Sequence, residues 1–236
     1  MARKPSRHRE RVSVDYSKEH WLLLTRLRCE AVRLMKVLEC SNIVAVVHGS
    51  IARGDVTVKS DIDVFVPNPP SSFVIETTLD RADVRIGRRV IIQATPRHVL
   101  KGYIEVDDRK TISFPLAKMS KTERGFYRFG GEVDLEGLRS NIRVVGVDKR
   151  LMLIVPTEKG HVESSVIGRE EEAASLIGTS PEIVLDRVRA LLRRDKIGRT
   201  GVFVEREVTY EETFEMTLKR LAETKPEVRR RLKFYE

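Results

Sequence analysis

The stretch that decides the fold of this chain is Gly49-Ser50-Ile51-Ala52-Arg53-Gly54, followed shortly by Ser60-Asp61-Ile62-Asp63-Val64. The apolar run at 43–47 precedes it and predicts a strand. A Gly-Ser turn after a strand presents backbone N–H groups and a hydroxyl to a polyphosphate, because glycine leaves room for a close approach. Asp61 and Asp63 are two residues apart, so on a strand both carboxylates project from one face. Adjacent carboxylates repel each other unless a cation lies between them, and hard oxygen ligands beside phosphate favour Mg²⁺.

The spacing of these residues resembles the nucleotidyltransferase superfamily that includes DNA polymerase β, CCA-adding enzymes and aminoglycoside nucleotidyltransferases. The likeness is greatest to the minimal prokaryotic and archaeal type, whose pattern is Gly-Ser-x-Ala-Arg-Gly-(Asp/Thr), a variable spacer and Ser-Asp-(Ile/Leu)-Asp. The residues that fit the pattern are Gly49, Ser50, Ala52, Arg53, Gly54, Asp55, Ser60, Asp61, Ile62 and Asp63. This ordered combination is far more specific than an isolated Asp-x-Asp, which is usually a solvated turn.

The resemblance implies a reaction in which a substrate hydroxyl attacks the α-phosphate of a nucleoside triphosphate in line and pyrophosphate leaves. It implies that Asp61 and Asp63 are catalytic and hold Mg²⁺, or alternatively Mn²⁺, as a pair of metals that stabilises the attacking and leaving oxygens. By the same resemblance Gly49 and Ser50 bind the phosphates of the nucleotide, and Arg53 adds a charge-assisted contact to the leaving phosphate. The acceptor, whether RNA, protein or a small molecule, is left open.

A third carboxylate, which catalytic members of the superfamily carry on a later neighbouring strand, has no clear counterpart here. Residues 103–115 predict a hairpin, and by analogy its returning strand places Ser113 at the position of that carboxylate. Glu105 and Asp107 on the outgoing strand, and Asp83, are alternative replacements, and the sequence does not choose among them. Without the third carboxylate, activation of the attacking hydroxyl would be weaker, since it commonly serves as metal ligand or base.

Hydrophobic periodicity predicts the elements around the motif. Residues 17–40 form one amphipathic helix, whose apolar positions are Leu24, Leu27, Ala31, Leu34, Met35 and Leu38. Further predicted elements are helices at 51–54 and 71–82, strands at 90–94, 142–147 and 151–155, and a helix that follows the capping box Ser120-Lys121-Thr122-Glu123. The predicted fold class is α+β: a polymerase β-like nucleotidyltransferase mixed sheet with flanking helices, followed by a small helix-turn-helix-like domain.

The segment 169–206 resembles a winged helix-turn-helix, with the β-wing at 196–206. Gly178 supplies the turn, Ser180 caps the second helix and Pro181 occupies its first position. Such a module would place its second helix in the major groove of a nucleic acid. The segment carries eight basic and seven acidic residues, a net +1 that suits a phosphate-dominated interface poorly. Because any compact helix pair uses the same turn and cap, nucleic-acid binding through the C-terminal segment is one of two interpretations.

The predicted domain organisation has three parts, a basic N-terminal tail over 1–15, a nucleotidyltransferase domain over 16–160, and a helix-turn-helix-like domain with a basic tail over 161–236. The net charge of +9 lies mostly at the two ends. Residues 1–12 carry five Lys or Arg against one Glu, and residues 219–236 carry seven against three Glu. Basic tails either bind phosphates through counterion release or keep a protein in solution, and both interpretations remain open.

The composition of the 236 residues, 41% of them hydrophobic, includes no apolar run near the length of a membrane span, so we expect a soluble protein without a membrane partner. The basic N-terminus lacks the apolar stretch of a secretory signal. Cys29 and Cys40 both fall in a helical pattern, which argues against a disulfide framework or zinc site and favours the cytoplasm. One Gln and three Asn against many Arg and Glu favour a thermophilic prokaryote.

Three chemically attractive groups are interpreted as structural. His48 directly precedes the Gly-Ser turn and is expected to pack at a strand end. His161 alternates with Glu163 as on a strand face, and a single His–Glu pair of this kind is commonly structural. The aromatic cluster at 126–129 suits packing of a short helix against a sheet better than stacking on a base.

The sequence thus carries competing functional hypotheses. The first is a Mg²⁺-dependent nucleotidyltransferase, which the intact Asp61/Asp63 pair favours. The second is a catalytically impaired domain that senses nucleotide and uses the helix-turn-helix to bind DNA or RNA, which Ser113 favours. A third is an assembly protein that acts through the long helix at 17–40 with an inert nucleotidyltransferase-like domain.

Overall fold

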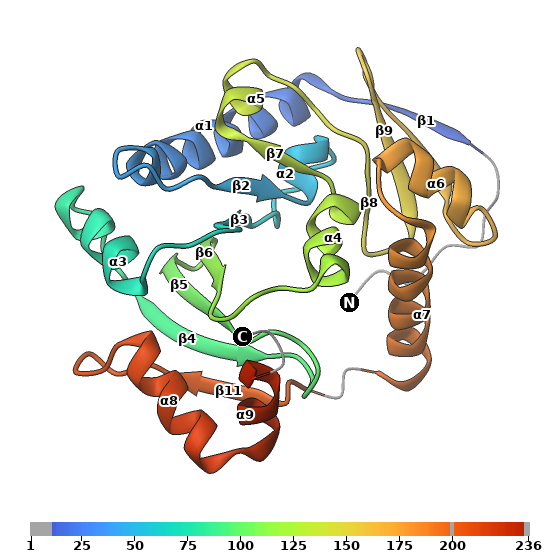
Figure 1. Cartoon of the computed structure of the whole chain (residues 1–236). Helices are drawn as coiled ribbons and strands as arrows, with labels where there is room; N and C mark the ends of the chain where they lie inside the picture. The colour runs from blue at the N-terminus through green and yellow to red at the C-terminus, as the bar shows by residue number, and fades with distance from the viewer. Residues whose placement is uncertain (1–10, 199–200, 234–236) are drawn as a thin grey trace. The chain divides into compact units, whose positions relative to one another are not determined.

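A computed structural model describes residues 11–198 and 201–233 of the chain (Figure 1). The chain forms two compact units, each built from segments that are distant in the sequence. Unit 1 comprises residues 1–32, 47–60 and 124–200, and unit 2 comprises residues 33–46, 61–123 and 201–236, each as far as it is described. The boundaries fall inside one long helix and inside the strand before Gly49, so the chain passes repeatedly from one unit to the other.

Helices and strands alternate along the described residues. The helices are α1 (Lys18–Glu39), α2 (Ser50–Arg53), α3 (Ser72–Arg81), α4 (Lys121–Gly130), α5 (Leu135–Arg139), α6 (Glu170–Ile177), α7 (Pro181–Ile197), α8 (Phe214–Thr224) and α9 (Pro226–Lys233). The strands are β1 (Val12–Asp15), β2 (Val46–His48), β3 (Ile62–Phe65), β4 (Arg88–Gln93), β5 (Lys101–Asp107), β6 (Lys110–Pro115), β7 (Glu132–Asp134), β8 (Gly146–Val147), β9 (Met152–Thr157), β10 (Gly160–Ser165) and β11 (Val204–Glu207). The chain is therefore α+β, as predicted. In the part of the chain that the structure describes, no helix is both long and apolar enough to cross a bilayer.

Unit 1 contains a small antiparallel sheet in the order β1-β10-β9-β8. β9 and β10 form a hairpin, and β1 adds to β10 with Val12 opposite Glu163. α6 and α7 lie beside each other in this unit (Figure 1) and close its apolar core. The buried members of the core are Phe129, Val147, Leu151, Leu153, Val166, Ala173, Ala174, Val184 and Val188.

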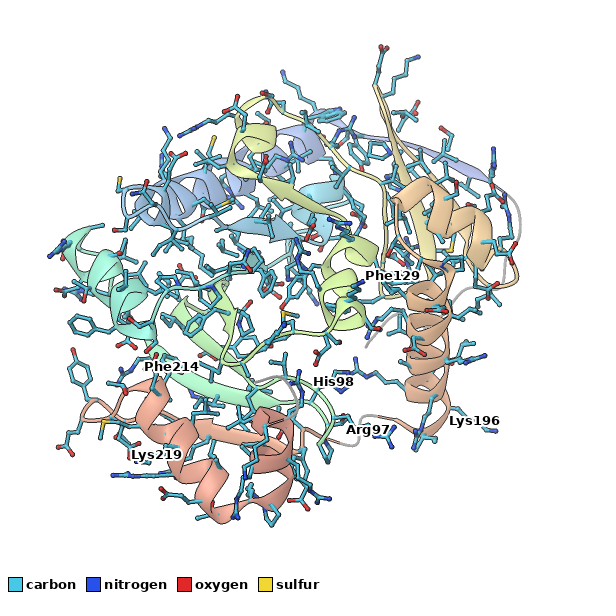
Figure 2. The ribbon with its side chains drawn as sticks, in the orientation of Figure 1. Arg97, His98, Phe129, Lys196, Phe214 and Lys219 are labelled. Carbon is cyan, nitrogen blue, oxygen red and sulfur yellow. The ribbon has the colours of Figure 1, made fainter. Side chains whose placement is uncertain are left out.

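Unit 2 contains a mixed sheet, within which its strands follow the order β11-β4-β5-β6-β3. β3 and β6 are parallel, and the other neighbours are antiparallel. Glu215 of α8 accepts hydrogen bonds from the N–H (2.9 Å) and hydroxyl (2.7 Å) of Ser72, which ties α8 to the start of α3. Phe214, at the start of α8 (Figure 2), meets Phe114 of β6 edge to face with ring centroids 5.1 Å apart, and both rings are buried.

Several predicted elements are confirmed. The helix at 17–40 is α1, and its six predicted apolar positions are buried. The hairpin at 103–115 is formed by β5 and β6. The capping box precedes α4: the Ser120 N–H donates to Glu123 Oε2 at 2.8 Å, and the Glu123 N–H donates to Ser120 Oγ at 3.2 Å.

The predicted β-wing over 196–206 is wrong. α7 continues to Ile197, and β11 pairs with β4 in the sheet of unit 2. The helix pair itself is present, because Gly178 ends α6 with a φ of 71° and Pro181 opens α7. A winged helix-turn-helix is therefore not confirmed.

Neither compact unit coincides with the predicted domains at 16–160 and 161–236, because each unit contains segments from both. The division at residue 160 stays a prediction. Within the predicted N-terminal tail, residues 12–15 form β1, and residues 1–10 lie outside the described residues.

Candidate active site

The Gly49-Ser50 turn belongs to unit 1, where it opens the four-residue helix α2. Gly49 has a φ of 83°, which side-chain-bearing residues rarely adopt, and its N–H donates to the carbonyl of Gly131 at 2.9 Å. Among the described residues, no atom lies within 4 Å of the position that a Cβ of Gly49 would take. Ser50 Oγ donates to Ser60 Oγ at 3.1 Å, and Ser60 Oγ accepts from the Thr57 N–H at 2.9 Å, so the following loop folds back onto the turn.

Arg28 of α1 binds the backbone of α2, a role that the sequence pattern did not reveal. Its side chain is buried, with 5% exposure, and it donates to the carbonyl oxygens of Ile51 and Ala52 at 3.1 Å each. Burial is the main reason that the pKa of Arg28 falls to about 10, which still leaves the guanidinium charged at neutral pH. The sequence could have indicated this role, because Arg28 lies four residues after Leu24 in the apolar stripe of α1, where a charged side chain needs a partner.

Gly54 closes α2 in a conformation that other residues would not tolerate. Its φ is 105°, and a Cβ added there would stand 2.6 Å from Cδ of Arg143. His20 Nε2 lies 2.8 Å from the Gly54 carbonyl oxygen, so this nitrogen is the donor. The motif turn is therefore fixed at both ends by residues of unit 1.

Arg53 is buried, with 5% exposure, and its guanidinium is occupied within unit 1. Nε and Nη2 donate to the two carboxylate oxygens of Asp55 at 3.0 and 2.9 Å, and Nη1 donates to the Gly130 carbonyl at 2.5 Å. Asp55 thus binds the Arg53 side chain next to the turn. The predicted contact of Arg53 with a leaving phosphate stays a prediction.

Asp61 and Asp63 belong to unit 2 and lie at the start of β3, where both line one cavity of about 530 Å³. The other residues that line it are Gly87, Arg88, Glu105, Asp107, Asp108, Arg109 and Thr111. Asp61 is exposed and Asp63 is partly exposed, whereas Ile62 and Val64 are buried. The predicted alternation of faces along this strand is confirmed, and it brings the two carboxylates to the same cavity.

Strand register aligns four polar side chains across the sheet of unit 2. Asp63 is opposite Thr111 of β6, Thr111 is opposite Glu105 of β5, and Glu105 is opposite Arg88 of β4. Residues paired across neighbouring strands direct their side chains to the same face. The row Asp63, Thr111, Glu105, Arg88 therefore shares one face, and all four residues line the cavity.

The residue beside Asp63 on the neighbouring strand is Thr111, and Ser113, the position given by analogy, lies two residues further along that strand. Ser113 is opposite Phe65, is 5% exposed, and does not line the cavity. A parallel register cannot be deduced from the spacing of two strands, because it depends on how the intervening chain crosses over. The position next to Asp63 thus carries a hydroxyl and not a carboxylate.

Glu105 is the first carboxylate in the row after Asp63. It lies 3.7 Å from a guanidinium nitrogen of Arg88. Asp107 also lines the cavity, but its carboxylate stabilises the hairpin turn by accepting from Lys110 Nζ at 2.8 Å and from the Arg109 N–H at 2.9 Å. Of the three alternatives that the sequence left open, the third, Asp83, is not among the residues that line the cavity.

Two further groups set the electrostatics of this face. Arg88 lies within 3.4 Å of carboxylate oxygens of both Glu205 and Glu207 on β11, and because these side chains are well exposed, each pair contributes little to stability. Burial, and to a smaller degree the negative charge of Asp63, raises the pKa of Tyr103 to about 12. Tyr103 therefore keeps its phenolic proton at neutral pH.

The donor set of the cavity fits a divalent cation that is shared with a substrate. Among the described residues, no three or more His, Cys, Asp or Glu side chains are grouped so as to hold a metal ion by themselves. Mg²⁺ commonly binds one or two carboxylates and completes its shell with phosphate oxygens and water. Asp61 and Asp63 supply hard carboxylate oxygens of this kind at one cavity.

The residues interpreted as structural are packed in unit 1. The ring of His48 contacts Tyr127 and Phe126 edge-on, with centroids 4.9 and 6.3 Å apart. His161 is 5% exposed, with Nδ1 2.8 Å from the hydroxyl of Tyr16 and Nε2 3.7 Å from the carboxylate of Glu163. These contacts agree with packing roles.

Comparison with known proteins gives a match over part of the chain. Residues 30–115 match the family model of the nucleotidyltransferase domain, and the matched segment holds both the Gly49-Ser50 turn and the Asp61/Asp63 pair. The match supports assignment of this part of the chain to the nucleotidyltransferase superfamily, and it implies a nucleotide substrate. No curated protein and no solved structure gives a match to the chain.

Proposed function

We propose that the protein is a Mg²⁺-dependent nucleotidyltransferase that moves a nucleoside monophosphate from a nucleoside triphosphate to a hydroxyl acceptor and releases pyrophosphate. The observation that carries the proposal is the meeting of Asp61 and Asp63 at one cavity, inside the segment that matches the nucleotidyltransferase domain. Two neighbouring carboxylates repel each other, so their placement at one cavity is best explained by a bound cation.

Within unit 2 the proposed roles follow from the lining of the cavity. Asp61 and Asp63 would hold Mg²⁺, or alternatively Mn²⁺, and the ion when bound would neutralise charge on the phosphates and on the leaving oxygen. Arg88 and Arg109 line the same cavity and offer charge-assisted hydrogen bonds to phosphate oxygens. Tyr103, protonated at neutral pH, remains a hydrogen-bond donor beside Asp63.

For unit 1 the proposal rests on the resemblance of the motif. In this proposal Gly49 and Ser50 contact the phosphates of the nucleotide. The open space beside Gly49 supports it, because glycine has no Cβ to block the approach of a phosphate there. Arg53 is the weaker part of this proposal, since its guanidinium already binds Asp55 and Gly130.

The proposal is tested by incubating purified protein with each α-³²P-labelled nucleoside triphosphate, Mg²⁺ and a total lysate, and by following label into RNA, protein and small molecules. Asp61→Asn and Asp63→Asn should each reduce transfer by about a hundredfold or more. Each should also weaken Mn²⁺ binding measured by electron paramagnetic resonance in the presence of nucleotide. Asp83→Asn is the matched control, because Asp83 is exposed and has a φ of 53°, which Asn adopts readily. Wild-type transfer in both pocket variants would overturn the proposal.

We further propose that Glu105 takes the place of the missing third carboxylate and accepts the proton of the attacking hydroxyl as that oxygen bonds to the α-phosphate and pyrophosphate leaves. Its support is the strand register, which makes Glu105 the first carboxylate in the row after Asp63. Glu105→Gln should lower transfer by about a hundredfold. Glu205→Gln is the matched control, because Glu205 also pairs with Arg88 but does not line the cavity. Equal losses in the two variants would show that Glu105 acts only through Arg88.

The alternative of a catalytically impaired nucleotide sensor that binds DNA or RNA through a winged helix is not favoured. Residues 204–207 pair with β4 and form no wing, and both motif aspartates line the cavity. Saturable nucleotide binding without transfer to any fraction would restore this alternative.

A further inference from the structure

Three segments of unit 2 that are distant in the sequence meet at one buried ion pair. They are the loop at 94–98 between β4 and β5, the segment at 116–122 that leads into α4, and α9 (Figure 1). The ion pair joins Arg231 of α9 to Glu123 at 3.0 Å, and the two side chains are only 4% and 11% exposed. Removing one partner of such a buried pair is costly, so the three segments are held together firmly.

The hydrogen bonds of this pair fix the backbone of the other two segments. Arg231 donates from Nε to the carbonyl of Arg97 at 3.1 Å and from Nη2 to the carbonyl of Lys118 at 3.2 Å. Glu123 accepts from the backbone N–H groups of Val99 at 2.5 Å and Ser120 at 2.8 Å. Because one guanidinium binds both carbonyls, Arg97 and Lys118 are neighbours in the fold although they are remote in the chain.

The surface around this ion pair carries a dense set of cations. Its exposed members are Arg97, Lys118, Lys121, Arg230 and Lys233, which we call the Arg231 surface. Arg97 lies with the exposed His98 on the loop between β4 and β5 (Figure 2). The segments 94–98 and 116–122 contain no Asp or Glu, and the single acidic residue of α9, Glu227, lies 3.5 Å from Arg230. The Arg231 surface therefore has a net positive charge that its own segments do not neutralise.

We propose that the Arg231 surface binds the phosphate backbone of RNA. Exposed arginine and lysine side chains with few neighbouring carboxylates attract phosphates strongly, and arginine offers a planar pair of donors to each phosphate. Among its described residues the surface includes exposed cations and one exposed histidine but no exposed aromatic ring, and this composition suits the backbone of the nucleic acid better than its bases. Binding is expected to be independent of base sequence and to weaken with salt.

The surface is separate from the cavity of Asp61 and Asp63. β4 begins at the cavity with Arg88 and ends at Gln93, next to the loop that carries Arg97, so the two lie at opposite ends of this strand. At about 3.3 Å per residue the strand spans roughly 20 Å, which a few nucleotides can bridge. Phosphate binding by the Arg231 surface is inferred independently of the proposed function. Only the choice of RNA over DNA rests on that function, since RNA combines backbone phosphates with ribose hydroxyls as acceptors of the nucleoside monophosphate.

The proposal is tested by fluorescence anisotropy of the full chain with a fluorescein-labelled single-stranded RNA of about 20 nucleotides, titrated between about 50 and 200 mM KCl, the range over which phosphate contacts are salt-sensitive. The test variant is the triple charge reversal Arg97→Glu/Lys118→Glu/Lys121→Glu. The matched control is Arg33→Glu/Lys36→Glu/Arg81→Glu, which makes the same change in charge at exposed positions of the same unit. Thermal melting of both variants checks that the fold is retained.

We expect the test variant to bind RNA with an affinity at least about tenfold lower than that of the wild type. The slope of log affinity against log salt should become less steep by about 2, since each single-strand phosphate contact contributes about 0.7. The control variant and Asp61→Asn/Asp63→Asn should bind RNA as the wild type does, which separates this surface from the proposed chemistry. Equal weakening in the test and control variants, or no RNA binding by the wild type, would overturn the proposal. Equal affinity for DNA of the same sequence would overturn only the choice of RNA and not the binding of a phosphate backbone.

Discussion

At the scale of single residues, His161 makes the stability of the fold depend on pH. Burial lowers its pKa, an effect that outweighs the attraction of Asp55 and Glu163 for the protonated ring, and Arg150 lowers the pKa further. The unfolded chain takes up this proton near pH 6.5, whereas the folded chain takes it up only at lower pH. The unfolded state therefore binds more protons below about pH 6.5, and the free energy of unfolding should decrease as the pH falls through that range.

The measurement is urea unfolding at a series of pH values between 5 and 7.5. His161→Gln should lose part of the decrease in unfolding free energy that the wild type shows below about pH 6.5. Its absolute stability will also change because the bond to Tyr16 is altered, so the slope against pH is the readout. Identical slopes for the wild type and His161→Gln would contradict the role given to His161.

The candidate site shows which residues a sequence can identify. Asp61 and Asp63 are found from spacing alone, because a strand determines their common face locally. Arg53 carries no such local information: its partners Gly130 and Val147 are 77 and 94 residues away. Glu105 likewise joins Asp63 only through the register of two other strands. Local periodicity therefore predicts the two aspartates that line the cavity, and long-range packing decides the residues around them.

At the scale of elements, two serines before helices provide a matched comparison. Ser120 precedes α4 and accepts a hydrogen bond from the Glu123 N–H at 3.2 Å. Ser180 is the N-cap of α7, but its side chain makes no capping hydrogen bond. Ser120→Ala should therefore lower the free energy of unfolding by about 1 kcal/mol, and Ser180→Ala by only a few tenths of that amount. Urea unfolding at pH 7 measures both, and a larger loss in Ser180→Ala would contradict the observed capping.

The elements that were predicted correctly are those whose signals are local. α1 follows from apolar spacing, α4 from its capping box, and the β5–β6 hairpin from two strands close in sequence. β11 was taken for a wing because its neighbours in sequence are helices, while its partner β4 lies more than a hundred residues earlier. β1 was missed within a basic tail for the same reason, since it pairs with β10.

At the scale of the whole molecule, we expect that a chain of residues 16–160 does not fold by itself. That piece would lack α6 and α7, which close the core of unit 1, and β11 and α8, which cover β4 and Phe114 in unit 2. Exposing a large buried apolar side chain costs roughly 1.5–3 kcal/mol, and a domain of this size is stable by only about 5–15 kcal/mol. Several such losses together exceed the stability available.

Circular dichroism of a chain consisting of residues 16–160, compared with the full chain, tests this expectation. The shortened chain should lack a cooperative thermal transition and the near-ultraviolet signal of packed aromatic rings. A cooperative transition at the temperature of the full chain would show that the predicted domain folds alone.

The late position of β11 also has a consequence for how the protein is made. During synthesis at about 5–20 residues per second, roughly 6 to 20 seconds separate the appearance of β4 from that of β11. Throughout this time the flank of β4 that β11 will cover is an open strand edge, which is a surface prone to pairing with other chains. We therefore expect unit 2 to complete its fold only near the end of translation, and the nascent chain to depend on chaperones that shield such edges.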